Sequence, residues 1–144
     1  MKKCADSAFK FMYPAKEQIL ETPFKLSKKT LQITADWKKN YLKNIKQKSE
    51  NEKLTEITTL ILALSAIPKP CVKLGTMYYY DPVGKTIFLD KHHPSVISAL
   101  HELGHFLYGN AELEACRFSV WLFKTIFPEF YQKLSWVGHL LVKK

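Results

Sequence analysis

The stretch ISALHELGHFLYGNAELEACRF, from Ile97 to Phe118, combines the side chains of a protein core with a dense set of ionisable groups. Two histidines and three glutamates lie within fourteen residues, namely His101, Glu102, His105, Glu112 and Glu114. Burying charge is costly unless an opposite charge or a metal ion compensates for it. We therefore expect some of these side chains to converge on a common partner.

The first half of this stretch predicts a helix that runs from Pro94, at its N1 position, to Tyr108. At 100° per residue, one broad arc of this helix is apolar, and a narrow stripe carries His101, Glu102 and His105. Histidines one turn apart can both reach one metal ion at about 2.0–2.1 Å. Glu102 is displaced enough to miss the metal and to reach a water bound to it. This is the H-E-x-x-H pattern of two zinc ligands and a general base, although histidines lining a solvated groove would give the same motif.

The second half predicts another helix, from Ala111 to Phe127, after Gly109 and Asn110 as stop and cap. On its helical wheel, Glu112 lies in the middle of the apolar face, whereas Glu114 lies on the other side beside Arg117. A carboxylate at the centre of a buried face needs a cation. Glu112 is therefore the expected third ligand of a divalent metal, most simply zinc.

The remaining sequence predicts three helical segments and one hairpin. Helical patterns cover a short segment near Ala15 to Glu21, a helix from Thr34 with Asp36 as a possible cap, and a helix from Lys53 to Ala66 that two prolines end. After it, Val72 to Tyr80 and Thr86 to Asp90 flank the turn signal Asp81-Pro82-Val83-Gly84. We expect these two runs to pair as a β-hairpin.

Length and composition limit the class of protein. The 144 residues, 47% of them hydrophobic, suit one globular domain, or a domain of about a hundred residues with an extension. The longest nearly uncharged run, Ile57 to Pro68, is far shorter than the roughly 20 apolar residues of a membrane span. The three scattered cysteines do not suggest a disulfide framework, and the N-terminus does not resemble a secretory signal. We expect a cytoplasmic protein without a membrane span.

The positive charge is concentrated in the N-terminal part of the chain. The formal net charge is +9, and residues 1–53 hold thirteen lysines against six acidic residues. Such a lysine-rich part can make weak contacts with nucleic acid or an anionic surface. However, Arg117 is the only arginine, and sequence-specific reading of DNA relies on arginine. Solvated helix faces are the simpler explanation.

The motifs HELGH and ELEACRF together resemble the gluzincin metallopeptidases, and more narrowly the ImmA/IrrE family and the minigluzincins. The resemblance runs from about Cys71 to Phe127. It implies an α+β fold, with a small zincin-like metallopeptidase domain over residues 51–144. That domain would contain a β-hairpin or small sheet, an active-site helix and a glutamate helix. Residues 1–50 do not resemble the family, and their charge and periodicity predict a basic, mainly helical extension.

The resemblance also implies the roles of individual residues. His101, His105 and Glu112 would bind Zn²⁺, and Glu102 would be the general base. Two features depart from the family: six residues separate His105 from Glu112, a shorter gap than is usual in the ImmA/IrrE proteins, and Cys116 replaces an Asp or Asn that commonly orients a ligand histidine. A thiol is a weak substitute in that role.

The expected function is that of a zinc-dependent endopeptidase, which hydrolyses peptide bonds of a protein or peptide substrate with zinc-bound water and Glu102 as the base. His139 and Tyr108 are candidate donors to the oxyanion. Two alternatives remain: a non-proteolytic metal-binding regulatory or interaction protein, and a basic nucleic-acid-binding module in which H-E-x-x-H is incidental. Metal content separates the last from the others, and replacement of Glu102 separates the first two.

Overall fold

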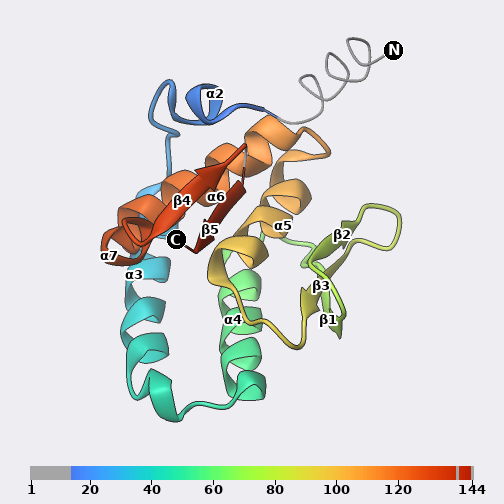
Figure 1. Cartoon of the computed structure of the whole chain (residues 1–144). Helices are drawn as coiled ribbons and strands as arrows, with labels where there is room; N and C mark the ends of the chain where they lie inside the picture. The colour runs from blue at the N-terminus through green and yellow to red at the C-terminus, as the bar shows by residue number, and fades with distance from the viewer. Residues whose placement is uncertain (1–13, 139, 144) are drawn as a thin grey trace.

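The computed structural model of the protein describes residues 14–138 and 140–143. The chain forms an α+β domain, as predicted, in which two central helices lie between N-terminal helices, a three-stranded sheet and a C-terminal hairpin (Figure 1). In chain order the elements are α2 (Lys16–Leu20), α3 (Lys28–Leu42), the 3₁₀ helix η1 (Ile45–Gln47), α4 (Glu50–Leu64), β1 (Cys71–Gly75), β2 (Tyr79–Asp81), β3 (Thr86–Asp90), α5 (Val96–Tyr108), α6 (Glu112–Ile126), α7 (Pro128–Tyr131), β4 (Leu134–Val137) and β5 (Leu140–Lys143). Every helix in the described residues is too short or too polar to span a bilayer.

The two central helices, α5 and α6, begin with different caps from those predicted. The Ser95 hydroxyl accepts a hydrogen bond from the Ser98 backbone at 3.2 Å and caps α5, so Pro94 precedes the cap instead of occupying N1. Helix α6 begins after Ala111, and Asn110 is therefore not its cap. The prediction for Gly109 is confirmed: it ends α5 with φ of 91°, a conformation that glycine adopts most readily.

Gly104 sets how closely α5 and α6 approach. A Cβ at this position would lie 2.9 Å from Ala115 Cα and 3.1 Å from the Ala115 carbonyl oxygen. Both atoms belong to the backbone of α6, so they cannot move aside as the end of a side chain would. The absence of a side chain at Gly104 therefore brings the two helices into backbone contact.

Helices α3 and α4 begin earlier than the hydrophobic pattern indicated. Helix α3 begins at Lys28 rather than Thr34, because the Ser27 hydroxyl caps it by accepting from the Thr30 backbone at 3.1 Å. Asp36, the predicted cap, lies inside α3. Helix α4 begins at Glu50, where Ser49 and Glu52 form a reciprocal capping box.

The strand prediction is right for one half of the hairpin and wrong for the other. Strand β2 pairs antiparallel with β3, as expected. Strand β1, however, pairs with the other edge of β3 in the parallel direction, which gives the sheet order β1-β3-β2. A bend over residues 76–78 splits the predicted strand and carries the chain across β3. Strand propensity does not specify which edge of a partner a strand joins.

One hydrophobic core joins most of these elements. Strand β3 is central and contributes the fully buried Ile87 and Leu89, which pack with α4 and α5. Helix α3 adds Tyr41 to the same core. A second cluster joins Ile19 of α2 to the α6 residue Val120. In the described part of the chain, residues before position 50 therefore share cores with residues after it.

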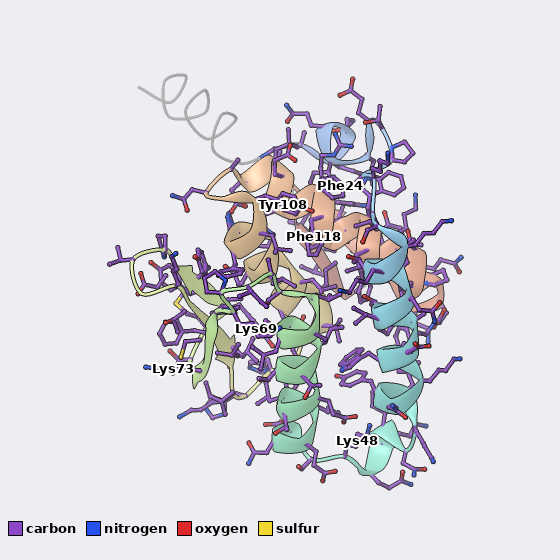
Figure 2. The ribbon with its side chains drawn as sticks, turned by 180° about the vertical axis from the view of Figure 1, so that it is seen from behind. Phe24, Lys48, Lys69, Lys73, Tyr108 and Phe118 are labelled. Atoms are coloured by element: carbon purple, nitrogen blue, oxygen red, sulfur yellow. The ribbon has the colours of Figure 1, made fainter. Side chains whose placement is uncertain are left out.

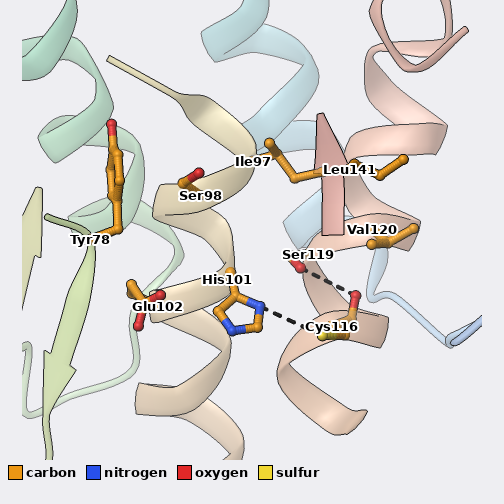
Figure 3. A pocket seen from close by; sticks show the side chains of 9 residues that line it. All are labelled: Tyr78, Ile97, Ser98, His101, Glu102, Cys116, Ser119, Val120 and Leu141. Atoms are coloured by element: carbon orange, nitrogen blue, oxygen red, sulfur yellow. Dashed lines mark hydrogen bonds between the residues drawn. The ribbon is translucent and has the colours of Figure 1, made fainter. Parts of the chain in front are cut away.

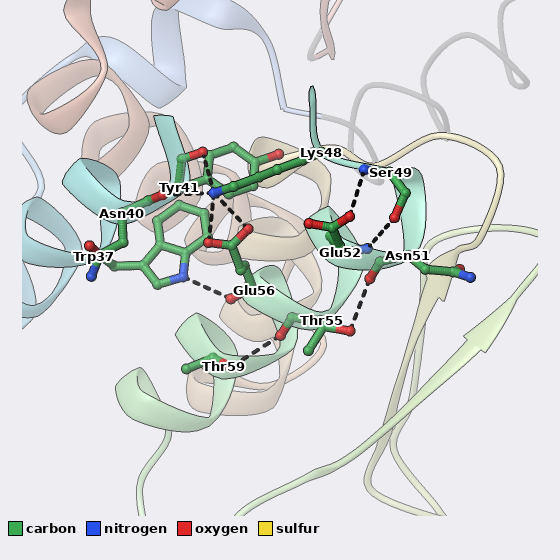
Figure 4. A network of polar contacts seen from close by, with 10 residues as sticks. All are labelled: Trp37, Asn40, Tyr41, Lys48, Ser49, Asn51, Glu52, Thr55, Glu56 and Thr59. Atoms are coloured by element: carbon green, nitrogen blue, oxygen red, sulfur yellow. Dashed lines mark hydrogen bonds and ion pairs between the residues drawn. The ribbon is translucent and has the colours of Figure 1, made fainter. Parts of the chain in front are cut away.

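Lys48 connects the C-terminal end of α3 to α4 through its side chain (Figure 4). Its ammonium group donates to the carbonyl oxygens of Asn40 and Tyr41 at 2.7 and 2.9 Å, at the C-terminal end of α3. It also forms an ion pair with Glu56 of α4 at 2.8 Å, and only 14% of its side chain is exposed. A cation favours the carbonyl end of a helix, so part of the N-terminal positive charge is structural.

We expect Gly104→Ala to lower the free energy of unfolding by about 1–3 kcal/mol, because the new methyl group overpacks the backbone contact. In an exposed helix the same change would stabilise by about 1 kcal/mol, so the sign itself is informative. Urea unfolding measures the effect. Gly75→Ala is the matched control, since its nearest contact would be an ordinary 3.6 Å to Phe88. Equal stability of the two variants would contradict the close approach.

We expect Lys48→Met to lower the free energy of unfolding by about 2 kcal/mol, because hydrogen bonds to a charged group are lost and Glu56 loses its partner. Lys46→Met changes an exposed lysine of η1 and should stay within about 0.5 kcal/mol of the wild type. Thermal and urea unfolding of both variants provide the measurement. A similar loss in both would show that general charge, rather than the Lys48 contacts, is responsible.

Candidate metal centre

His101, His105 and Glu112 meet where α5 and α6 are joined by their short connection. The Nε2 atoms of His101 and His105 lie 3.3 and 2.6 Å from the same Glu112 carboxylate oxygen, Oε1. One potential ligand atom from each residue lies within 4.8 Å of the others. The helical phase predicted for α6 is confirmed, because Glu112 rather than Glu114 faces the imidazoles.

The two imidazole rings are held through their other nitrogens. His105 Nδ1 donates to the Gly109 carbonyl oxygen at 3.0 Å. His101 Nδ1 lies 3.8 Å from the Cys116 sulfur, which also lies 3.9 Å from Glu112 Oε2. In both rings Nε2 is therefore the nitrogen that faces Glu112 Oε1.

This donor set fits a zinc ion. Two ligand atoms of a tetrahedral zinc, each about 2.0–2.1 Å from the metal, are about 3.3 Å apart. The separation between His101 Nε2 and Glu112 Oε1 has that value, and the 2.6 Å contact of His105 needs to lengthen by less than an ångström. Two imidazoles and one carboxylate form a ligand set known from catalytic zinc sites, which keep a fourth position open.

The cluster is also satisfied as an ion pair. Burial alone would raise the pKa of Glu112, but hydrogen bonds and charge interactions with His101 and His105 outweigh it and hold that pKa well below its usual range. Burial lowers the pKa of His105, while its hydrogen bonds to Glu112 and the Gly109 carbonyl raise it, with a net increase. Because Nδ1 already donates to a carbonyl, the 2.6 Å contact describes an imidazolium paired with a carboxylate.

Glu102 lies beside the cluster without joining it. Its side chain, with those of His101 and Cys116, lines a cavity of about 280 Å³ between α5 and α6 (Figure 3). Burial raises the pKa of Glu102 above its usual value, although the charges of His101 and His105 and the backbone of Tyr80 partly oppose this shift. A carboxylate with a raised pKa is a stronger base, as a proton acceptor from water requires.

Tyr78 is a residue of this cavity that the sequence did not single out. Its ring lines the wall, while its hydroxyl donates to the His93 carbonyl at 2.6 Å and accepts from the Ser95 backbone at 2.7 Å. Burial, the larger cause, raises its pKa to about 12. Tyr78 thus fixes the start of α5. The polar side chains of Ser98 and Ser119 also line the cavity.

The structure does not bring Tyr108 to the cluster. Tyr108 packs against Phe24 and Phe118, each with ring centroids 5.6 Å away, on the face seen in Figure 2. Burial, and then the charge of Glu114, raises the Tyr108 pKa. The other predicted oxyanion donor, His139, lies outside the described residues. Cys116, by contrast, occupies the place expected for a residue that orients His101, and burial raises its thiol pKa to about 12.

Comparisons of this chain with protein-family models, curated proteins and solved structures gave no match. The interpretation of the site therefore depends on its own geometry and chemistry.

We expect the purified protein to bind about one zinc ion per chain, because three donor groups converge on one point. His101→Ala and Glu112→Ala should each weaken binding by more than the roughly 10- to 100-fold that loss of a residue orienting a ligand costs. Titration of the metal-free protein against a zinc-sensitive chelator measures this affinity. Glu114→Ala, on the same turn of α6, should leave it unchanged. Folded wild-type protein that takes up no zinc would contradict the metal centre.

Proposed function

We propose that this protein is a zinc-dependent endopeptidase with a small zincin-like domain. The observation that carries the proposal is the convergence of His101, His105 and Glu112 beside the half-buried carboxylate of Glu102. Of these residues, His101 and Glu102 line a cavity. Each group has a necessary part in peptide hydrolysis: three ligands for a metal ion and one base for water. Cytoplasmic location and a protein or peptide substrate belong to the same proposal.

Each of these residues would have its own role in peptide hydrolysis. His101, His105 and Glu112 hold the metal ion, which when bound polarises the scissile carbonyl and lowers the pKa of water. Glu102 accepts the proton from the attacking water and passes it to the leaving amine, so that it is first a base and then an acid. The raised pKa of Glu102 suits both steps. Tyr78 and Ser95 hold the start of α5, the helix that carries His101, Glu102 and His105.

Strand β2 supports a peptide rather than a small molecule as the substrate. It lies at an edge of the sheet, and the backbone of its residue Tyr80 is close enough to Glu102 to lower the pKa of that carboxyl group. An extended peptide can pair with such an edge through main-chain hydrogen bonds. A peptide bound at the edge of β2 would lie beside Glu102, the carboxylate that activates water.

Cys116 favours a second candidate function, a metal-binding regulatory or interaction protein without proteolysis. A neutral thiol 3.8 Å from His101 Nδ1 is a weak hydrogen-bond acceptor and orients the imidazole less firmly than a carboxylate would. The nucleic-acid alternative has less support, since Lys38 and Lys48 are paired with Glu129 and Glu56.

We expect Glu102→Gln to reduce peptide cleavage by about 10²- to 10⁴-fold, because the change keeps the size of the side chain and removes the base. Zinc affinity and the far-UV circular dichroism spectrum should remain those of the wild type. The assay incubates a mixture of unfolded proteins with the zinc-loaded enzyme and identifies new termini by mass spectrometry.

Glu114→Gln is the control for this experiment, since it removes a carboxylate from the same region but outside the cavity. It should cleave as the wild type does. Equal cleavage by the Glu102→Gln variant and the wild type would assign the activity to a contaminating protease. Zinc binding without cleavage by the wild type would instead favour the regulatory function.

A further inference from the structure

A second, larger hollow adjoins the cavity at the metal centre. Its volume is about 550 Å³, and it shares Ile97, Ser98 and Leu141 with the smaller cavity. The shared residues Ile97 and Ser98 belong to the first turn of α5, so the two hollows adjoin at the start of this helix. We call the larger hollow the distal groove.

The walls of the distal groove are mainly apolar and come from distant parts of the chain. Tyr41 and Ile45 contribute from the end of α3 and from η1. Phe127 and Phe130 also line it, at the end of α6 and in α7. Phe130 is 36% exposed, so part of its ring is open to an occupant of the groove.

The charge at the distal groove is positive. Lys133 lines it, 5.6 Å from the ring centre of Phe130, and no carboxylate belongs to its described lining. The acidic side chain nearest in sequence to Phe130, Glu129, is paired with Lys38 at 2.7 Å. An apolar occupant that also carries negative charge would therefore be complementary to this groove.

The two hollows together follow the start of α5, since the smaller cavity is lined as far as His101 and Glu102 and the distal groove as far as Val96 and Pro94. Val96 and His101 are about 8 Å apart along the helix at 1.5 Å per residue. An extended chain covers that distance with two to three residues at about 3.3 Å each. A single peptide can thus occupy the metal centre and the distal groove together.

We propose that the distal groove binds the segment of the substrate that lies about three to five residues from the scissile bond, and that it selects apolar side chains next to acidic ones. The proposal rests on the proposed peptidase function and adds the substrate class to it. Phe130 supplies the apolar contact, and Lys133 supplies the charge.

Binding to the zinc-loaded Glu102→Gln protein tests this selectivity without cleavage. The probe is a fluorescein-labelled dodecapeptide that contains Leu and Phe followed by two Glu, together with its reversed sequence. Matched peptides carry Ser in place of Leu and Phe, or Lys in place of Glu. Fluorescence anisotropy should show about tenfold tighter binding of one acidic apolar probe than of either matched peptide.

Substitutions in the groove test where the probe binds. Phe130→Ala and Lys133→Glu, each added to Glu102→Gln, should weaken binding by about tenfold, as expected when a central aromatic or charged contact is lost. Tyr108→Ala and Lys73→Glu are the controls, because neither residue lines either hollow, and they should stay within about twofold. Lys133 is exposed, so its substitution reports on the groove even if Phe130→Ala destabilises the fold.

The possible results separate this proposal from the peptidase function. Probe binding that depends on Phe130 and Lys133, without any cleavage by the wild type, would keep the groove and overturn the peptidase. Cleavage by the wild type with unchanged rates and sequence preference in the Phe130→Ala and Lys133→Glu enzymes would overturn the groove alone. Laurate binding that needs both residues while the peptides do not bind, or a dimer that Phe130→Ala dissociates, would replace the peptide with another occupant and also overturn the proposal.

Discussion

The backbone contact between Gly104 and Ala115 is the constraint on which the site depends. With hydrogen as the only side chain at Gly104, α5 approaches the backbone of α6 directly. That approach brings Glu112, the first residue of α6, to hydrogen-bonding distance from His105. Any larger spacing would leave a half-buried carboxylate without its partners, which is the costly case for a charged group.

The connection between the helices contributes a second part of the same geometry. Gly109 ends α5 with a positive φ, and its carbonyl oxygen accepts from His105 Nδ1. The turn that reverses the chain therefore also selects which imidazole nitrogen faces Glu112. As a result, one arrangement can be stable both as an imidazolium–carboxylate pair and as a set of metal ligands, since exchanging a proton for a cation preserves the compensation of charge.

The sequence best predicted features that depend on one helix alone, such as the direction in which a side chain points. The periodicity of α5 and α6 distinguished Glu112 from Glu114, because side-chain direction in a helix follows from position alone. Sequence-based prediction failed for features that depend on contacts between residues far apart in the chain. The parallel pairing of β1, the contact of Tyr78 with Ser95, and the placement of Tyr108 against Phe24 all depend on tertiary packing. The distal groove was not predicted, because its walls come from segments far apart in the chain. The pairing of the C-terminal strands β4 and β5 was also not predicted.

The N-terminal helices show why their lysines are a poor guide to a partner. Lys38 donates to the Ile126 carbonyl at the end of α6, and Lys48 donates to carbonyls at the end of α3. Both lysines thus stabilise helix ends rather than present a free charged face. Their positions also fix Tyr41 and the end of α6, which both line the distal groove. Lys38 and Lys48 therefore contribute to the structure through the helix ends that they hold in place.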